Sequence, residues 1–106
     1  MNKKYIVRKN EEIENIIKTN NKLTNKFFII YYKDNILNYN RFCVSVSKKL
    51  GKAHIRNYYK RVIKDILSKN IINTSYDYVI ILRNGVLNLK YLNIKDELLK
   101  LLKGEN

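Results

Sequence analysis

The segment from Ser45 to Lys64 constrains the fold most, because it combines a high density of positive charge with regularly placed apolar residues. Seven of its twenty residues are Lys or Arg, and none is Asp or Glu. Apolar side chains run through the same segment, at Val46, Leu50, Ile55, Val62 and Ile63. A disordered basic tail would not need these side chains, so the segment predicts a folded surface built to hold a polyanion.

A helix is predicted from within Lys52–Asn57 to about Lys69. At about 100° per residue, the side chains of this helix divide into two faces. The predicted core face comprises Tyr59, Val62, Ile63, Ile66 and Leu67. The other face is basic and comprises Arg56, Asn57, Lys60, Arg61 and Lys64. The helix is therefore expected to pack on one side and to present cations on the other.

The remaining elements follow from hydrophobic periodicity. A short amphipathic helix is predicted from Asn10, a candidate capping residue, to about Asn20. Three strands are predicted at Phe27–Tyr32, with both faces covered, at Arg41–Ser47 and at Asp77–Arg83. A turn at Asn84 and Gly85 leads to a closing helix from Tyr91. The predicted order is α-β-β-α-β-α, in one α/β domain that spans residues 1–106.

The charge balance indicates an anionic partner. Twenty-two Lys and Arg residues against nine Asp and Glu residues give a formal net charge of +13. Nucleic acid, an anionic membrane surface and an acidic protein all remain open on charge alone. Membrane binding is disfavoured because the basic helix has no exposed aromatic anchor beyond Tyr58. Duplex DNA binding by a helix-turn-helix is disfavoured because a strand precedes the basic helix.

No apolar run is long enough to span a bilayer or to form the core of a signal peptide, so a cytoplasmic protein is expected. A protein active site is not indicated either. His54 is the only histidine and is interpreted as a structural residue at the start of the basic helix. Cys43 is the only cysteine and is interpreted as a small packing residue. The carboxylates Asp34, Asp65, Asp77 and Asp96 are too scattered to indicate a metal site, so no catalytic residue, metal or bound cofactor is expected.

The stretch "RFCVSVSKKLGKAHIRNYYKRVIKDIL" closely resembles the signature of the bacterial ribonuclease P protein subunit. The resemblance implies a two-layer α+β sandwich with a mixed sheet and a left-handed β-α-β crossover. Physical rules alone would have favoured a right-handed crossover, which accounts for about 98% of cases. The resemblance also implies that a catalytic RNA, using Mg²⁺, removes the 5′ leader from precursor tRNA while the protein assists.

Two sets of site residues are carried over from the family. Those expected to bind the RNA subunit are Lys48, Lys49, Lys52, Arg56, Asn57, Lys60, Arg61 and Lys64. Those expected to line a cleft for the single-stranded leader, between the first helix and the sheet, are Ile13, Ile17, Phe27, Ile29 and Tyr31. The chain departs from the family pattern at four positions: Ile13 and Ile17 replace residues that are often Phe, Cys43 replaces Gly, and Tyr58 replaces Arg.

Two rival functions stay open at this point. A ribosomal-type or chaperone protein could bind structured RNA with a similar α/β fold and no cleavage partner. A stand-alone nuclease would instead cleave precursor tRNA without any RNA subunit. Only the ribonuclease P interpretation predicts a single dominant RNA partner that restores cleavage when it is recombined with the protein.

Overall fold

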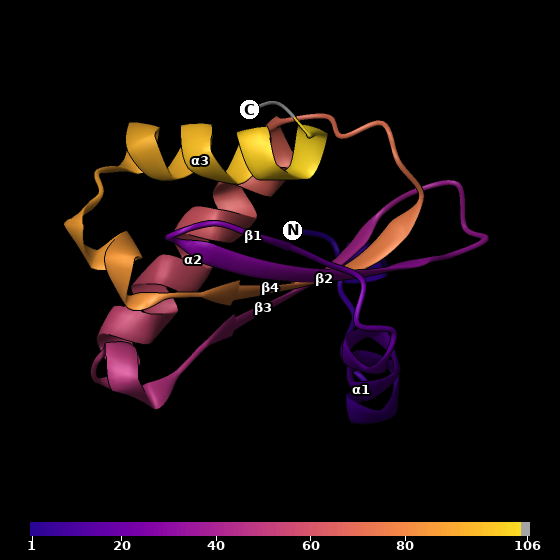
Figure 1. Cartoon of the computed structure of the whole chain (residues 1–106), viewed down its shortest axis with the longest axis horizontal. Coiled ribbons are helices and arrows are strands. Elements are labelled where there is room, and N and C mark those ends of the chain that lie inside the picture. Colours follow the sequence, from indigo (N-terminus) through magenta and orange to yellow (C-terminus); the bar gives the residue numbers. More distant parts are fainter. Residues whose placement is uncertain (105–106) are drawn as a thin grey trace.

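The computed structural model describes residues 1–104 and has a four-stranded mixed sheet with three α-helices (Figure 1). The last two residues of the predicted domain, 105–106, lie outside the described part. The α-helices are α1 (Asn10–Lys18), α2 (Ala53–Lys69) and α3 (Tyr91–Lys103). The strands are β1 (Lys22–Thr24), β2 (Phe28–Asp34), β3 (Arg41–Val46) and β4 (Tyr76–Leu82). Three short 3-10 helices are η1 (Lys3–Tyr5), η2 (Lys48–Leu50) and η3 (Asn84–Asn88).

The sheet has the order β1-β2-β4-β3, so β4 lies inside it and β3 forms an edge. β2 is antiparallel to β1 and to β4, whereas β3 and β4 are parallel neighbours. Parallel neighbours need a crossover connection, and α2 supplies it. The mixed sheet, the β-α-β crossover and the order of the predicted elements are confirmed.

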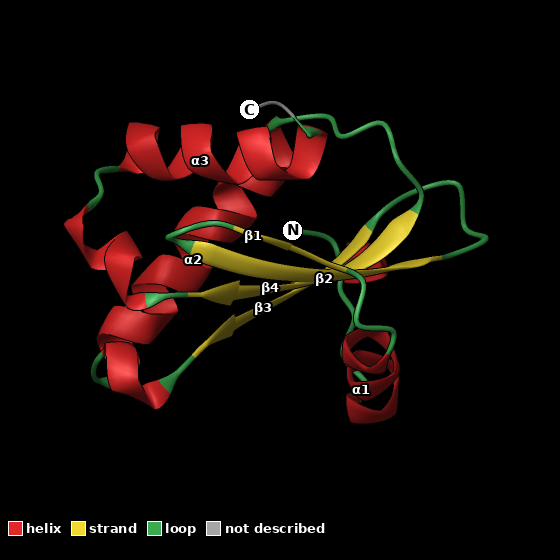
Figure 2. Cartoon of the chain, in the orientation of Figure 1, coloured by secondary structure: helices red, strands yellow, loops and turns green. Residues whose placement is uncertain are grey.

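One face of the sheet carries the main core. α2 and α3 lie over this face, as Figure 2 shows. The fully buried side chains between these helices and the sheet include Phe28, Ile30 and Ile80 from the strands, and Ile63 and Ile66 from α2. Strand residues of one parity point to this face, which is why the buried residues of β2 and β4 alternate with those of the opposite face.

The opposite face is covered only in part. α1 lies beneath one half of the sheet, and within residues 1–104 no other α-helix lies on this side (Figure 2). Ile16 of α1 is fully buried and packs with Val7 and Val79 in a second, smaller hydrophobic cluster. The prediction that both faces of the first long strand are covered therefore holds on the core face and only partly on this one.

Two local predictions differ from the structure. β1 was not predicted, because only Leu23 of its three residues is apolar and no alternation can develop over so short a strand. Asn10 was expected to cap α1, but the N-cap is Lys9, with no hydrogen bond from its side chain. The chain is already bound to the sheet at Val7, whose amide donates to the carbonyl of Phe42 at 2.9 Å, and it enters the helix directly from there.

Candidate RNA-binding surfaces

The predicted basic residues share one surface, which we call the α2 surface. It comprises Lys48 and Lys49 on η2, Lys52 at the N-cap of α2, and Arg56, Asn57, Lys60, Arg61 and Lys64 on α2 itself. Five of the eight are exposed, and Arg56, Lys60 and Lys64 are half-buried. The structure thus brings together all eight residues expected to bind the RNA subunit.

The half-buried members lie on one flank of α2. Arg56, Lys60 and Lys64 are spaced four residues apart, which places them in a row along the helix. Asp65 marks the other flank, where its carboxylate accepts a hydrogen bond of 2.6 Å from the hydroxyl of Tyr91 at the start of α3. The row of cations therefore lies on the side of α2 that faces away from α3.

The same row lies close to β3. Burial raises the pKa of the Cys43 thiol on β3, whereas the positive charges of Lys60 and Lys64 act to lower that pKa. α2 packs against β3, and this flank of the helix carries Lys60 and Lys64. α2 thus presents Lys60 and Lys64 beside the edge strand of the sheet.

Within residues 1–104, no carboxylate forms an ion pair with a cation of the α2 surface. Among residues 1–104, the ion pairs join Arg41 to Glu12 and Asp77, and Lys69 to Asp65. The Nε atom of Arg56 is buried and has no hydrogen-bond partner among the described residues. Unpaired cations at close spacing repel one another, so this surface is suited to an anionic ligand that would relieve the repulsion.

Gly51 forms the junction between η2 and α2. Its φ of 149° lies in a region that side-chain-bearing residues rarely adopt. A Cβ atom at this position would also lie 3.1 Å from Cδ1 of Ile55. Glycine here therefore sets the angle between the η2 lysines and the α2 cations.

Four of the five residues expected in the leader cleft lie on α1 or on the face of the sheet that α1 covers in part, which we call the α1-side face. Tyr31 is aligned with Val79 across the strands, and Ile29 is aligned with Ile81. Tyr31 and Ile13 are partly buried in the smaller hydrophobic cluster. Ile17 is 37% exposed at the end of α1. These residues lie together on one side of the sheet.

Phe27 does not belong to this group. Its side chain packs against the main core on the other side of the sheet. Its ring also lies against Gly85, where an added Cβ would meet Cδ1 of Phe27 at 3.2 Å. Phe27 precedes the first residue of β2, so strand alternation does not decide the direction of its side chain.

The contact between α1 and the sheet is tightly packed, and an open part of the sheet face lies beside it. Ile16 and Val79 are 0% and 1% exposed where α1 meets the sheet, which leaves no room for a nucleotide between them. The uncovered part of the face lies toward the carboxyl ends of β3 and β4, where Ser45 is aligned with Ile81. A strand of RNA on this face would therefore run alongside α1.

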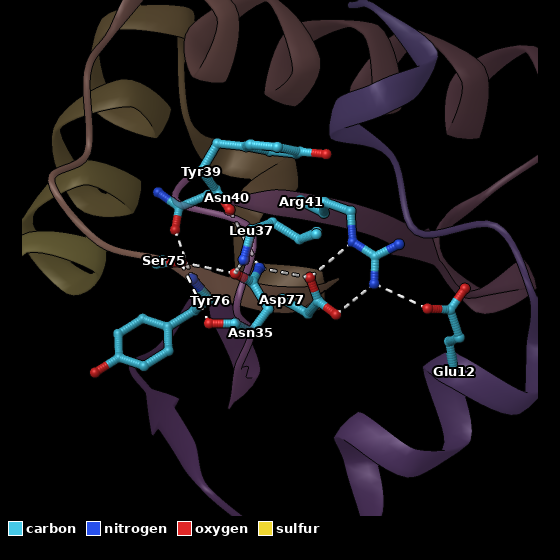
Figure 3. A network of polar contacts seen from close by, with 9 residues as sticks. All are labelled: Glu12, Asn35, Leu37, Tyr39, Asn40, Arg41, Ser75, Tyr76 and Asp77. Atoms are coloured by element: carbon cyan, nitrogen blue, oxygen red, sulfur yellow. Dashed lines mark hydrogen bonds and ion pairs between the residues drawn. The ribbon is translucent and has the colours of Figure 1, made fainter.

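Sequence reasoning missed a polar network that links α1 to the sheet (Figure 3). The guanidinium of Arg41 donates to both carboxylate oxygens of Asp77, at 2.9 and 2.6 Å, and to Glu12 of α1 at 2.8 Å. Asp77 also accepts a hydrogen bond of 2.9 Å from Asn35. The only signal in the sequence was a charged residue at the start of each of two predicted strands, Arg41 and Asp77.

Within this network, Glu12 and Asp77 neutralise the positive charge of Arg41. The hydrogen bond to Asp77 is the largest cause that raises the pKa of Arg41 above its ordinary value. Asp77 is only 7% exposed, so its charge needs this partner. Arg41 begins the family-like motif, but its role in the structure is to hold α1 against β3 and β4.

His54 and Cys43 are the remaining candidates for chemistry. His54 is exposed in the first turn of α2, and Cys43 is half-buried at the edge of the smaller cluster. Within the part of the chain that the structure describes, no group of three His, Cys, Asp or Glu side chains is placed to hold a metal ion. Within residues 1–104, no helix is both long and apolar enough to cross a lipid bilayer.

Comparison with known proteins identifies the family. A family model described as Ribonuclease P matches residues 1–105. The ribonuclease P protein component of Mycoplasma mycoides subsp. mycoides is 44% identical over 106 residues, covering 97% of this chain and 97% of the relative. That of a Geobacillus species is 40% identical over 106 residues, covering 97% and 91%.

Solved structures agree in fold. The RNase P protein of Staphylococcus aureus has a TM-score of 0.84 and 32% identity, covering 93% of both chains. That of Thermotoga maritima has a TM-score of 0.87 and 28% identity, covering 93% of this chain and 96% of its own. The chain therefore belongs to the ribonuclease P family, as an RNA-binding protein subunit of that endoribonuclease.

Proposed function

We propose that this chain binds the catalytic RNA subunit of ribonuclease P and the 5′ leader of precursor tRNA, and that the RNA carries out the cleavage with Mg²⁺. The protein would contribute positive charge and a shaped surface, and no protein side chain would take part in the bond-breaking step. We place this activity in the cytoplasm, because the relatives are bacterial and the substrate is a cellular transcript.

The observation that carries the proposal is the unneutralised α2 surface. Its seven Lys and Arg side chains lie on two consecutive elements, and none of them makes an ion pair within residues 1–104. Arg binds phosphate oxygens in a bidentate manner, and Lys acts as a point charge toward them. We therefore assign the RNA subunit to the α2 surface.

We assign the leader to the open part of the α1-side face. Tyr31 is the aromatic side chain in the smaller cluster on this face, and an aromatic ring can stack on any base. Ile13 and Ile17 offer apolar contact without stacking. Affinity for the leader should thus depend on the ring of Tyr31 and on the charges around it, with little preference among bases.

Reconstitution with the cognate RNA subunit tests the proposal. The recombined complex should remove the leader from precursor tRNA at a lower Mg²⁺ concentration than the RNA alone requires, and the RNA-free protein should leave the substrate intact. Affinity for the RNA subunit should fall steeply with salt, with a log-log slope on the order of −0.7 to −0.9 for each phosphate neutralised. Cleavage by RNA-free protein, or a slope near zero, would contradict the assignment.

A further inference from the structure

The N-terminal segment of the chain lies along the edge of the sheet. The amide of Val7 donates to the carbonyl of Phe42 at 2.9 Å, and Ile6 forms a parallel bridge with Phe42. β3 is an edge strand, so this segment extends the sheet by a short stretch beyond it. Val7 is 2% exposed, which fixes the segment in place.

Four cations flank this contact, and we call them the N-terminal basic cluster: Lys3, Lys4, Arg8 and Lys9. All four are exposed, and none makes an ion pair within residues 1–104. They line an open hollow of about 700 Å³, which also includes Glu11, Glu12 and Arg41. Glu12 is engaged by Arg41, so Glu11 is the carboxylate there that is left to oppose the four cations.

Aromatic side chains border the same cluster. The rings of Tyr5 and Tyr39 meet edge to face with their centroids 5.5 Å apart. The ammonium group of Lys4 lies 4.7 Å from the centre of the Tyr39 ring and 5.3 Å from that of Tyr5. Cations interleaved with partly exposed rings are typical of surfaces that bind RNA.

The N-terminal basic cluster and the α2 surface lie along the same strand. The cluster is anchored at Phe42, and Tyr5 and Phe42 border one hollow together with Leu67 and Ser68 near the end of α2. The two surfaces therefore adjoin at the outer edge of β3. From there the α2 surface continues through Arg56 to the lysines of η2.

We infer that the N-terminal basic cluster binds backbone phosphates of the RNA subunit and so extends the α2 surface along the edge of β3. This inference rests on the proposed function, because continuity with the α2 surface is what selects the RNA subunit over the leader. The leader is assigned to the α1-side face, whereas the cluster lies at the outer edge of the sheet. The contact would be to phosphates, without base specificity.

The test compares two variants with the same change in charge. The first replaces the cluster as Lys3→Gln, Lys4→Gln, Arg8→Gln and Lys9→Gln. The control replaces four lysines on or next to α3, on the core side of the sheet, as Lys90→Gln, Lys95→Gln, Lys100→Gln and Lys103→Gln. Affinity for the isolated RNA subunit is measured by filter binding across a salt series, and circular dichroism confirms that each variant is folded.

We expect the cluster variant to bind the RNA subunit about tenfold more weakly than the control variant at 0.15 M salt, with a shallower salt slope by about 0.7 for each phosphate lost. A variant with Lys3→Arg, Lys4→Arg and Lys9→Arg should retain the affinity of the wild type. Equal affinity of the cluster and control variants would overturn the inference. So would a loss confined to long-leader substrates in the assembled enzyme, because the occupant would then be the leader.

The proposed function and the role of the N-terminal basic cluster can fail separately. If the wild-type protein does not bind the RNA subunit, the proposed function itself is wrong. If the wild-type protein binds with a steep salt slope and the cluster variant matches the control, only the extension to the N-terminal segment is wrong.

Discussion

At the scale of single residues, Arg41 shows how this chain separates structural from functional charge. Its guanidinium is held by Asp77 and Glu12, whereas the cations of the α2 surface have no acidic partner within residues 1–104. Residue type alone does not distinguish the two roles. Asp77 and Glu12 lie far from Arg41 in the sequence, so only the fold shows which positive charges remain available to RNA.

Replacing Arg41 with Ala should destabilise the protein by about 3 kcal/mol, because Asp77 would keep a buried and unpaired charge. Urea unfolding monitored by circular dichroism measures this cost. Lys69→Ala is the control, since Lys69 and Asp65 form an exposed pair whose loss should cost no more than about 1 kcal/mol. Similar losses in the two variants would show that the Arg41 network does not hold α1 to the sheet.

Tyr31 supports a prediction about the substrate. Tyr31→Leu keeps an apolar side chain in the smaller cluster but removes the aromatic face. Stacking is worth about 1 to 3 kcal/mol per base, so affinity for leader-bearing precursor tRNA should fall while affinity for mature tRNA stays unchanged. Binding of both RNAs to the assembled enzyme tests this. An equal fall for both would show that the leader does not bind this face. Tyr32→Leu, on the core side of the same strand, controls for the general loss of a tyrosine.

At the scale of elements, the two flanks of α2 make different contacts. One flank joins α3 through Asp65 and Tyr91, and the other presents cations beside β3. The apolar side between them is buried at Val62, Ile63 and Ile66. The helix can therefore lose cations from one flank without losing the contacts that hold it in the fold.

The double change Arg56→Ala and Arg61→Ala should weaken binding to the RNA subunit by tenfold or more without unfolding the chain. Two phosphate contacts would be lost, so the log-log salt slope should also become shallower by about 1.4 to 1.8. Titration of labelled RNA at several salt concentrations gives both quantities. Lys95→Ala with Lys100→Ala on α3 is the matched control, and the same loss there would mean that total charge, and not the α2 surface, determines binding.

The contact between α2 and α3 should depend on pH in two directions. The hydrogen bond from Tyr91, and then that from Lys69, lowers the pKa of Asp65, and the same bond to Asp65 raises the pKa of Tyr91. A lowered carboxyl pKa gives stability that is present above the unfolded-state pKa and is lost as the pH falls through the folded-state value. A raised tyrosine pKa gives stability that is present below the unfolded-state pKa and is lost as the pH rises through the folded-state value.

Wild type should therefore be more stable than Tyr91→Phe near neutral pH, and the difference should shrink below about pH 4 and above about pH 10. Thermal unfolding of both proteins across this pH range tests the prediction. Because both side chains remain partly exposed to solvent, we expect a small difference even at its maximum. A difference that does not change with pH would mean that the hydroxyl acts by packing alone.

Most elements could be predicted from the sequence because their hydrophobic periods are long and clear. The residues that bury α2 in the core, from Val62 to Leu67, follow from helical spacing alone, and the start of α3 at Tyr91 is also as predicted. β1 and the cap of α1 could not be predicted, because pairing with β2 and the bond from Val7 to Phe42 determine them. Such long-range contacts leave no local pattern.

At the scale of the whole molecule, a candidate site could be predicted from the sequence only where a local stretch of residues forms it. The α2 surface lies within the short stretch 48–64, so a local motif predicts which residues belong to it. The α1-side face is assembled from α1, β2, β3 and β4, and the structure places Phe27 on the other side of the sheet. The N-terminal basic cluster was not predicted at all, because its link to the α2 surface depends on the pairing of Ile6 with Phe42.

The central place of β4 has a consequence for synthesis on the ribosome. β2 and β3 are not neighbours, and β4, which begins only at Tyr76, joins the β1-β2 pair to β3. Until β4 has left the exit tunnel, α2 of the growing polypeptide has no complete sheet to pack against. We expect such nascent chains to attract RNA by charge alone and to gain a defined binding geometry late in translation, once β4 has emerged.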